Sequence, residues 1–315
     1  MGRFILRRLA FFIFTLFLTS VLIFALTRIL PGDVARVLVG REAGEQALQS
    51  VRAELGLDDP LTIQYVHWAS DFVRGDLGLT FSRPRQPIAD LLATRLRNSG
   101  RLALLTLLIA VPLSILLGVV AGLTEGRLPD GVISVLSLSV AALPEFVTGL
   151  FLINVVALQF GWFPASSAIS PDAAFAEALP ALWLPAITAT LVLMAYIVRL
   201  TRAGVIEELK RAYVATATLK GIPRRTVVFK HVLRNALIPT ITVIATSTGW
   251  LISGLVVIEF VYSYPGIGRL LIFAINNRDL PTIQAVVMVT VVVILLANFI
   301  ADMLYAVLNP RISLS

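Results

Sequence analysis

Long apolar stretches recur along the chain and are separated by shorter polar ones. A helix that crosses the hydrocarbon core of a bilayer, which is about 30 Å thick, needs roughly 20 apolar residues because each adds about 1.5 Å. Six stretches reach or approach this length, and we expect a transmembrane helix at each of 9–30, 102–123, 132–160, 184–200, 237–261 and 283–308. The third is interrupted by Pro144 and Glu145. The pattern therefore predicts an all-α integral membrane protein.

The first apolar stretch could also be taken for a secretory signal peptide, because Arg3, Arg7 and Arg8 precede its start. It is too long for that, and no small-x-small cleavage site follows it. We therefore expect a retained first helix whose N-terminus lies in the cytoplasm.

In the second apolar stretch, Gly118 and Gly122 lie one helical turn apart, a spacing that lets another helix approach closely.

Residues 31–98 have a different pattern, polar and nearly balanced in charge, with eight arginines against nine acidic residues. Three short amphipathic helices are predicted there, beginning at Glu45, at Asp59-Pro60 and after Pro87. One stripe of the second carries Leu61, Tyr65, Trp68 and Phe72. Because none of the three could span a bilayer by itself, we expect this segment to form a small helical cap outside the cytoplasm.

Composition agrees with a lipid environment. Hydrophobic residues make up 57% of the chain and charged residues 14%, whereas soluble domains have about 45–50% apolar and about 25% charged residues. The absence of cysteine excludes disulfides and thiolate ligands. The two histidines, His67 and His231, lie too far apart in the sequence to suggest a site. Nothing in the composition favours an enzyme or a metal site.

The net charge of +7 is concentrated in one loop. Residues 199–234 contain nine basic residues, including all three lysines, and only two acidic ones. A basic loop beside apolar helices is typical of the cytoplasmic side of a membrane protein and does not indicate nucleic-acid binding.

With a cytoplasmic N-terminus, six membrane crossings return the C-terminus to the cytoplasm. We expect a cytoplasmic N-terminus and first helix (1–30), the cap (31–98) and a five-helix membrane core (99–315) that contains the cytoplasmic loop 199–235.

The basic loop also predicts a defined local structure. Good helix formers run up to Lys220, and Gly221 can adopt the left-handed conformation that ends a helix. Pro223 suits the start of the next helix. The small side chains at 215–217 would let another surface approach closely, although a solvated loop lying against lipid is an equally open interpretation of these residues.

This segment resembles the "EAA" cytoplasmic loop of binding-protein-dependent ABC permeases, with Ala215-Thr216-Ala217 in the EAA position and Gly221 as its glycine. The peptide branch fits best, because Tyr213–Ile222 and His231–Pro239 follow its patterns Y-V-R-T-A-x-A-K-G-L and H-x-L-R-N-A-L-I-P. Further motifs that resemble dipeptide, oligopeptide and nickel permeases occur in order at Ile5–Arg8, Leu30–Asp33, Leu55–Pro60, Gln64-Tyr65, Gly75–Gly78, Val257–Glu259, Tyr264–Gly268, Asn277–Asp279, Ala301–Ala306 and Asn309–Arg311. Two departures from the general loop, Ala215 for glutamate and Arg234 for proline, are usual in the peptide branch.

The resemblance implies the type I ABC importer permease fold and a multi-pass subunit of a bacterial or archaeal inner (cytoplasmic) membrane. It would pair with a second homologous permease, two ATPase subunits and an extracytoplasmic solute-binding protein, and form half of the pathway for a peptide or related small solute. The chain has no G-x-x-x-x-G-K-[ST] motif, so ATP and Mg²⁺ would be bound by partner subunits, with no cofactor on this chain. The implied coupling residues are Tyr213, Ala215, Thr216, Ala217, Lys220, Gly221, Arg224 and Arg225.

Polar residues within apolar stretches are candidates for the translocation pathway, because charge in hydrocarbon is costly and usually faces an interior or a pathway. Glu145 is expected near mid-membrane, where it could meet a cationic group of the substrate, or be paired internally or protonated. Glu259 and Asn154 are further candidates. Internal pairing is the other interpretation of Glu259 and Asp302, and Asn154 and Asn298 could bridge helices.

Two other classes of protein compete with a permease subunit. An ion-coupled secondary transporter commonly has repeated halves with broken helices at matched positions, whereas this sequence has one such break, at Pro144, and no repeat. A membrane-embedded hydrolase would need a Ser/His or metal constellation inside the bilayer, and neither histidine is expected there.

Overall fold

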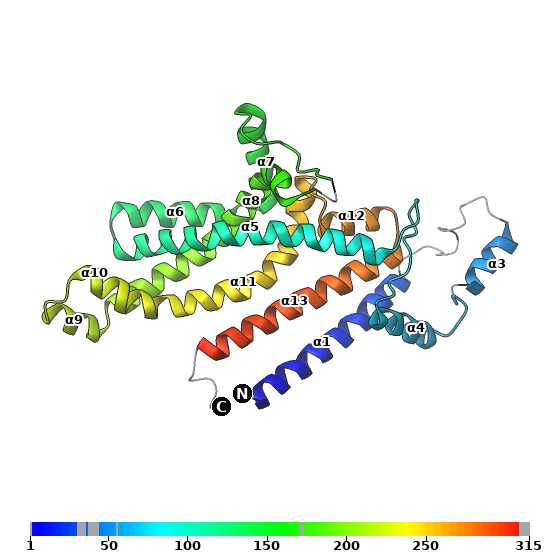
Figure 1. Cartoon of the computed structure of the whole chain (residues 1–315), viewed down its shortest axis with the longest axis horizontal. Coiled ribbons are helices and arrows are strands. Elements are labelled where there is room, and N and C mark those ends of the chain that lie inside the picture. The colour runs from blue at the N-terminus through cyan, green and yellow to red at the C-terminus, as the bar shows by residue number, and fades with distance from the viewer. Residues whose placement is uncertain (1, 30–35, 37–43, 55, 171–172, 309–315) are drawn as a thin grey trace. The chain divides into compact units, whose positions relative to one another are not determined.

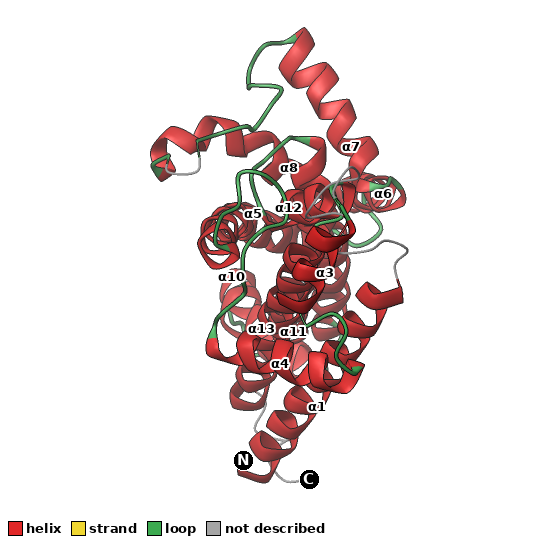
Figure 2. Ribbon diagram, turned by 90° about the vertical axis from the view of Figure 1, so that its right-hand side faces the viewer, coloured by secondary structure: helices red, strands yellow, loops and turns green. Residues whose placement is uncertain are grey.

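The computed structural model of the 315-residue chain describes residues 2–29, 36, 44–54, 56–170 and 173–308. In this part of the chain the regular structure is helical, apart from one isolated bridge between Leu79 and Pro87. Figure 2 shows helices joined by loops. The Leu30–Asp33 and Asn309–Arg311 motifs, and the end of the first expected span, lie outside the described residues.

The helices follow one another in a simple order along the sequence. They are α1 (Gly2–Ile29), α3 (Glu45–Glu54), α4 (Leu61–Arg74), α5 (Ile88–Leu123), α6 (Leu128–Ala142), α7 (Glu145–Leu152), α8 (Phe175–Leu209), α9 (Ala212–Leu219), α10 (Arg224–Thr226), α11 (Leu233–Val261), α12 (Ile267–Asn276) and α13 (Leu280–Leu308). Two π-helical segments, η1 (Ile153–Gln159) and η2 (Val227–Val232), continue α7 and lead into α11.

Among the described residues, five helices are long and apolar enough to cross a membrane, and six if the bent pair α6 and α7–η1 is one broken span. The two arms of this pair are bent by 105° between Ala142 and Glu145, and Figure 1 shows α7 turning away from the line of α6. Pro144 explains the break, because it cannot donate a backbone hydrogen bond and disfavours a helical conformation at the residue before it. The all-α membrane fold and its interrupted third span are confirmed.

The chain forms two compact units. The first comprises Met1–Asn98 and Pro265–Leu295, and the second Ser99–Tyr264 and Leu296–Ser315. Residues 88–98 of α5 therefore belong to the first unit and the remainder of that helix to the second.

In the first unit, α4 packs its aromatic stripe against α1. The Phe24 ring contacts Tyr65 edge-on at 5.5 Å and Trp68 at 5.8 Å between ring centroids. The hydroxyl groups of Ser20 and Tyr65 are hydrogen-bonded at 2.8 Å. Helix α4 ends at Gly75, in the left-handed region at φ 82°. The predicted aromatic stripe thus has a partner, whereas Leu61 at its start stays exposed.

A carboxylate fixes the start of α13 within the same unit. The Oδ2 of Asp279 accepts hydrogen bonds from the backbone N–H of Phe81 and of Ser82, at 3.0 and 3.1 Å, and from the Ser82 hydroxyl at 3.0 Å. Its Oδ1 accepts one from the N–H of Thr282, within the first turn of α13, at 3.3 Å. Residues nearly 200 positions apart are therefore held together by one buried side chain.

The second unit is built around α8, which packs against α6, α7 and α11. Its close contact with α5 depends on Gly118 and Gly122. A Cβ at Gly118 would lie 2.5 Å from Cβ of Thr201, and one at Gly122 2.7 Å from Cβ of Val205. The close helix contact predicted from this glycine spacing is confirmed, and α8 is the partner helix.

Two features differ from the expected elements. Residues 88–123 form one continuous helix, where we expected a short cap helix followed by a separate span. Asn98, Ser99 and Gly100 are weak helix formers, yet the helix runs through them without a break. The segment after Gly266 also forms a helix, α12, between two expected spans where no element had been expected.

Candidate functional site

The basic loop folds as its sequence predicts. Helix α9 ends at Leu219, and Gly221 adopts a left-handed conformation at φ 74°. The N–H of Gly221 donates to the carbonyl of Thr218 at 2.9 Å, and that of Ile222 to the carbonyl of Ala217 at 3.2 Å. This pair of bonds is the Schellman arrangement, which satisfies carbonyls at a helix end. Pro223 then caps the short α10, so a helix, a sharp turn and a second helix follow in succession.

One face of α9 anchors the loop to the rest of the second unit. Ala217 is 9% exposed and packs in a cluster with Val205 of α8, Val227 and Val232 of η2, and Ala236 of α11. Ala217, one of the small residues expected to meet another surface, therefore faces the chain's own core.

The other face of the loop is open. The exposed implied coupling residues are Tyr213, Ala215, Thr216, Lys220, Gly221, Arg224 and Arg225. Two large apolar side chains share this exposure, Leu219 at 89% and Phe229 at 70%. Sequence reasoning missed both, although two large apolar residues within a basic loop were a signal that could have been used. Each adds exposed apolar surface to a segment that is rich in basic side chains.

The start of α9 is held by a local polar network. The Tyr213 hydroxyl donates a hydrogen bond to the Glu208 carboxylate at 2.6 Å. Partial burial, followed by this bond to Glu208, raises the pKa of Tyr213, so its phenol stays neutral and remains the donor. The neighbouring Arg211 pairs with Glu207 at 2.7 Å. Because these groups are largely exposed, such pairs set orientation more than stability.

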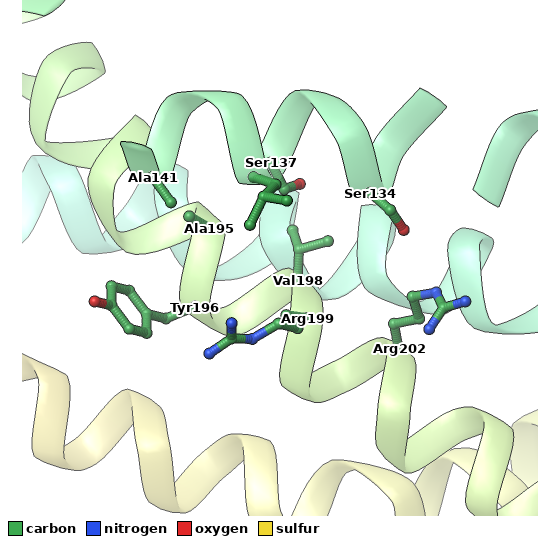
Figure 3. Close-up of a pocket in the computed structure, with 9 residues that line it drawn as sticks. Ser134, Ser137, Ala141, Ala195, Tyr196, Val198, Arg199 and Arg202 are labelled. Atoms are coloured by element: carbon green, nitrogen blue, oxygen red, sulfur yellow. The ribbon is translucent and has the colours of Figure 1, made fainter. Parts of the chain in front are cut away.

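A second feature lies beside α6, α7 and α8 in the same unit. One cavity, of about 310 Å³, is lined by Ser134, Ser137, Tyr196, Arg199 and Arg202, among others (Figure 3). A second, of about 420 Å³, is lined by Pro144, Glu145, Tyr196 and Val257, among others. The two share Ala141 and Tyr196 and so adjoin each other. We call the combined space the α6–α8 groove.

An ion pair fixes the two walls of this groove. The Arg202 guanidinium donates two hydrogen bonds to the Asp130 carboxylate, at 2.5 and 2.8 Å. The Asp130 carboxylate also accepts from the N–H of Gly126 at 2.9 Å and from the Ser134 hydroxyl at 3.2 Å. The bidentate geometry is specific as well as strong. It joins the start of α6 to α8, and sequence reasoning did not find it.

Tyr262 holds α7 in place after the bend. Its ring is fully buried, and its hydroxyl donates to the carbonyl of Gly149 in α7 at 3.1 Å. The same hydroxyl is hydrogen-bonded to the Thr188 hydroxyl of α8 at 2.8 Å. A single side chain thus ties α7 to α8.

The three candidate pathway residues do not share one cavity in the described part of the chain. Glu145 lines the α6–α8 groove. Glu259 is 1% exposed, and its carboxylate accepts a hydrogen bond from the Ser99 hydroxyl at 2.5 Å, which supports internal pairing. Asn154 lies in η1, where its Oδ1 accepts from Gln159 at 3.0 Å. Asn298 lies against Gly249, whose Cβ position would be 2.6 Å from its Oδ1, in keeping with a bridge between α13 and α11.

The described residues contain no group of three or more His, Cys, Asp or Glu side chains that could hold a metal ion. What the second unit offers is a basic loop with an exposed contact face and a groove that carries charges of both signs.

Comparison with known proteins places these features in a family. Residues 114–314 match the family described as "Binding-protein-dependent transport system inner membrane component", and residues 1–89 match the related "Binding-prot-dependent transport system membrane comp, N-term". The glutathione transport system permease protein GsiC of Shigella flexneri serotype 5b is 38% identical over 312 residues, which covers 99% of each chain. The probable peptide ABC transporter permease protein y4tP of Sinorhizobium fredii has the same identity and coverage.

A solved structure supports the fold. The crystal structure of an amino acid ABC transporter with histidines contains a chain that superposes with a TM-score of 0.52 at 15% identity, covering 69% of this chain and 93% of that one. Its likeness concerns the fold alone, and that fold is the permease fold expected from the resemblance. The matches over the whole chain do not favour an ion-coupled carrier. The chain belongs to the family of binding-protein-dependent transport system inner membrane components, and it is a multi-pass, non-catalytic permease subunit of an ATP-driven ABC importer.

Proposed function

We propose that this chain forms one half of the translocation pathway of a peptide importer. A second, homologous permease would form the other half, two ATPase subunits would bind ATP and Mg²⁺, and a solute-binding protein would deliver the substrate from outside the cytoplasm. The basic loop would dock on an ATPase subunit and transmit its closure to the membrane helices. The two states of such a switch must differ in their affinity for nucleotide or for substrate.

The observation that carries the proposal is the division of the 212–226 loop into a buried and an open face. Ala217 anchors α9 in the core formed with α8, η2 and α11. Leu219 and the basic residues Lys220, Arg224 and Arg225 project from the open side. A force applied to this open side would therefore reach α8 and α11 through packed side chains.

Peptide-like solutes are proposed as substrates on two grounds. The sequence motifs resemble those of the peptide branch, and the relatives at 38% identity are described as glutathione and peptide permeases. Glutathione is itself a small peptide with several charged groups. The substrate class is therefore a short peptide, whose selection would begin at the solute-binding protein.

The orientation follows from charge. The basic loop and the arginines at 3, 7 and 8 would lie in the cytoplasm under the positive-inside rule. Both termini would then be cytoplasmic, and the cap at 31–98 would face the solute-binding protein. The membrane would be the inner (cytoplasmic) membrane of a bacterium or archaeon.

Replacing Gly221 by valine tests the docking role. Gly221 has φ 74° and no atom within 4 Å of its Cβ position, so valine would distort the turn rather than the packed core. A β-branched residue in the left-handed region costs on the order of 1–3 kcal/mol. We expect Gly221→Val to reduce ATP-dependent uptake into proteoliposomes by at least about tenfold, with ATP hydrolysis retained but no longer stimulated by substrate.

Gly75→Val is the matched control, because Gly75 also lies in the left-handed region, at φ 82°, and has an empty Cβ position, but it ends α4 in the first unit. We expect both variants to lower the unfolding temperature by a similar amount and only Gly221→Val to lose coupling. Full coupled transport by Gly221→Val would refute the docking role of the loop.

A further inference from the structure

The α6–α8 groove carries opposite charges at its two ends. Arg199 lines the cavity that also contains Ser134 and Ser137, and Glu145 lines the adjoining one. In Figure 3, Tyr196 and Arg199 project from the same side of α8, and the Arg199 side chain extends toward Tyr196. The groove thus runs from a carboxylate, past an aromatic ring, to a guanidinium.

Arg199 and Glu145 differ from the other charged groups in their surroundings. Arg202 is already neutralised by its two hydrogen bonds to Asp130. No side chain among the described residues bonds to the Arg199 guanidinium or the Glu145 carboxylate. Arg199 is exposed at the end of the groove that adjoins the basic loop, whereas Glu145 is half-buried, where an unpaired carboxylate is costly unless it meets a pathway. These two groups are therefore available to a ligand.

The length of α8 that lines the groove sets the length of the ligand. Val192, which lines the Glu145 end, precedes Arg199 by seven residues on α8, or about 10 Å at about 1.5 Å per helical residue. An extended tripeptide spans roughly 10 Å at about 3.3–3.6 Å per residue. A free amino acid carries both charged groups on the same carbon atom and cannot reach both ends of the groove.

We propose that the α6–α8 groove binds a short peptide of about three residues as a zwitterion, with its α-ammonium group at Glu145 and its terminal carboxylate at Arg199. This inference rests on the proposed function and adds a substrate site within this chain. Ser137 also lines this end and can donate a hydrogen bond to the same carboxylate, whereas the Ser134 hydroxyl already donates to Asp130. Tyr196, whose ring is exposed halfway along the groove, contacts the middle of the peptide.

The length and charge pattern set the selectivity. A peptide with an amidated C-terminus loses the contact with Arg199, and one with an acetylated N-terminus loses the contact with Glu145. A hydrogen bond to a charged group contributes about 1.5–3 kcal/mol, which corresponds to a change of roughly ten- to a hundredfold in affinity. Loss of either terminal charge should therefore weaken binding to the groove by that factor.

Equilibrium binding of labelled trialanine tests the proposal. The purified importer complex is placed in nanodiscs without the solute-binding protein, so that only the membrane site is measured. We expect Arg199→Gln to weaken binding of trialanine ten- to a hundredfold but to leave binding of trialanine amide unchanged. Glu145→Gln should weaken trialanine and trialanine amide alike and leave N-acetyl-trialanine unchanged. This double-mutant logic isolates each pairwise contact.

Arg127→Gln is the matched control, since Arg127 is an exposed arginine at the start of α6 outside the groove. The Arg127→Gln complex should bind trialanine, trialanine amide and N-acetyl-trialanine as tightly as the unaltered complex does. Absence of trialanine binding to the unaltered complex, or equal trialanine binding by all variants, would contradict the proposed peptide site in the groove.

Uptake by the whole importer separates this inference from the proposed function. ATP-dependent peptide uptake by the unaltered complex with its solute-binding protein, combined with equal peptide binding by all variants, would retain the peptide importer and reject the groove. Failure of the unaltered complex to take up any peptide would reject the proposed function itself.

Discussion

Gly118 determines how closely α5 and α8 approach in the second unit. A methyl group there would lie 2.5 Å from the Thr201 Cβ and 2.9 Å from the Val198 carbonyl oxygen, both far inside van der Waals contact. Gly118→Ala should therefore force the helices apart at a cost of about 1–3 kcal/mol. We expect a lower unfolding temperature for the purified chain in detergent.

Gly131→Ala is the control for this substitution. Gly131 lies within α6 and has no atom within 4 Å of its Cβ position, so alanine should leave stability unchanged or raise it by up to about 1 kcal/mol through helix propensity. Equal unfolding temperatures for the two variants would show that the close approach at Gly118 does not contribute to stability.

Single residues differ in how far their roles could be predicted from the sequence. Gly118 and Gly221 were predictable because each acts through its own backbone and its immediate neighbours. Asp130 and Arg202 were not, because 72 positions separate them and only the folded arrangement of α6 and α8 brings them together. Ala217 shows the same limit, since its small size was recognised but the side of α9 on which it lies was not.

Helix α7 is the element whose position matters most for the groove. It follows the 105° bend, and the hydroxyl of Tyr262 ties it to α8 through Gly149 and Thr188. Tyr262→Phe removes both hydrogen bonds at a cost of about 1 kcal/mol. We expect α7 to become more mobile, which would appear as a broader distance distribution between spin labels at Phe151 and Phe175 in pulsed electron paramagnetic resonance.

The chain is suited to this measurement because it has no cysteine, so paired labelling sites can be introduced without background. Tyr196→Phe is the control, since no residue in the described part of the chain is hydrogen-bonded to the Tyr196 hydroxyl and its side chain is exposed. An unchanged distribution in Tyr262→Phe would mean that apolar packing alone fixes α7.

The elements were predicted well where the pattern was long and local. The expected spans at 237–261 and 283–308 end where α11 and α13 end and begin only three or four residues late. Pro144 indicated a break but could not give its angle, because the direction of α7 depends on Tyr262, more than a hundred residues later. The continuity of α5 was missed because Asn98, Ser99 and Gly100 are weak helix formers and indicated a boundary, whereas the folded chain keeps them helical.

At the scale of the whole molecule, the chain supplies helices, a groove and a contact loop, and the ATP hydrolysis belongs to other subunits. Its apolar exposure fits this view, since many large apolar side chains of α1, α5, α6 and α7 are exposed in the isolated chain. Lipid and a second permease would both cover such surfaces. The family and the fold followed from the motifs and the hydrophobic pattern, whereas the partners can be established only on the assembled complex.

The most direct test of the account is mass spectrometry on the complex isolated through a tag on this chain from its native cell. We predict recovery of a second, homologous permease, ATPase subunits and a solute-binding protein that carries a short peptide. Recovery of this chain alone, under detergent conditions that preserve other ABC importers, would contradict the proposed assembly.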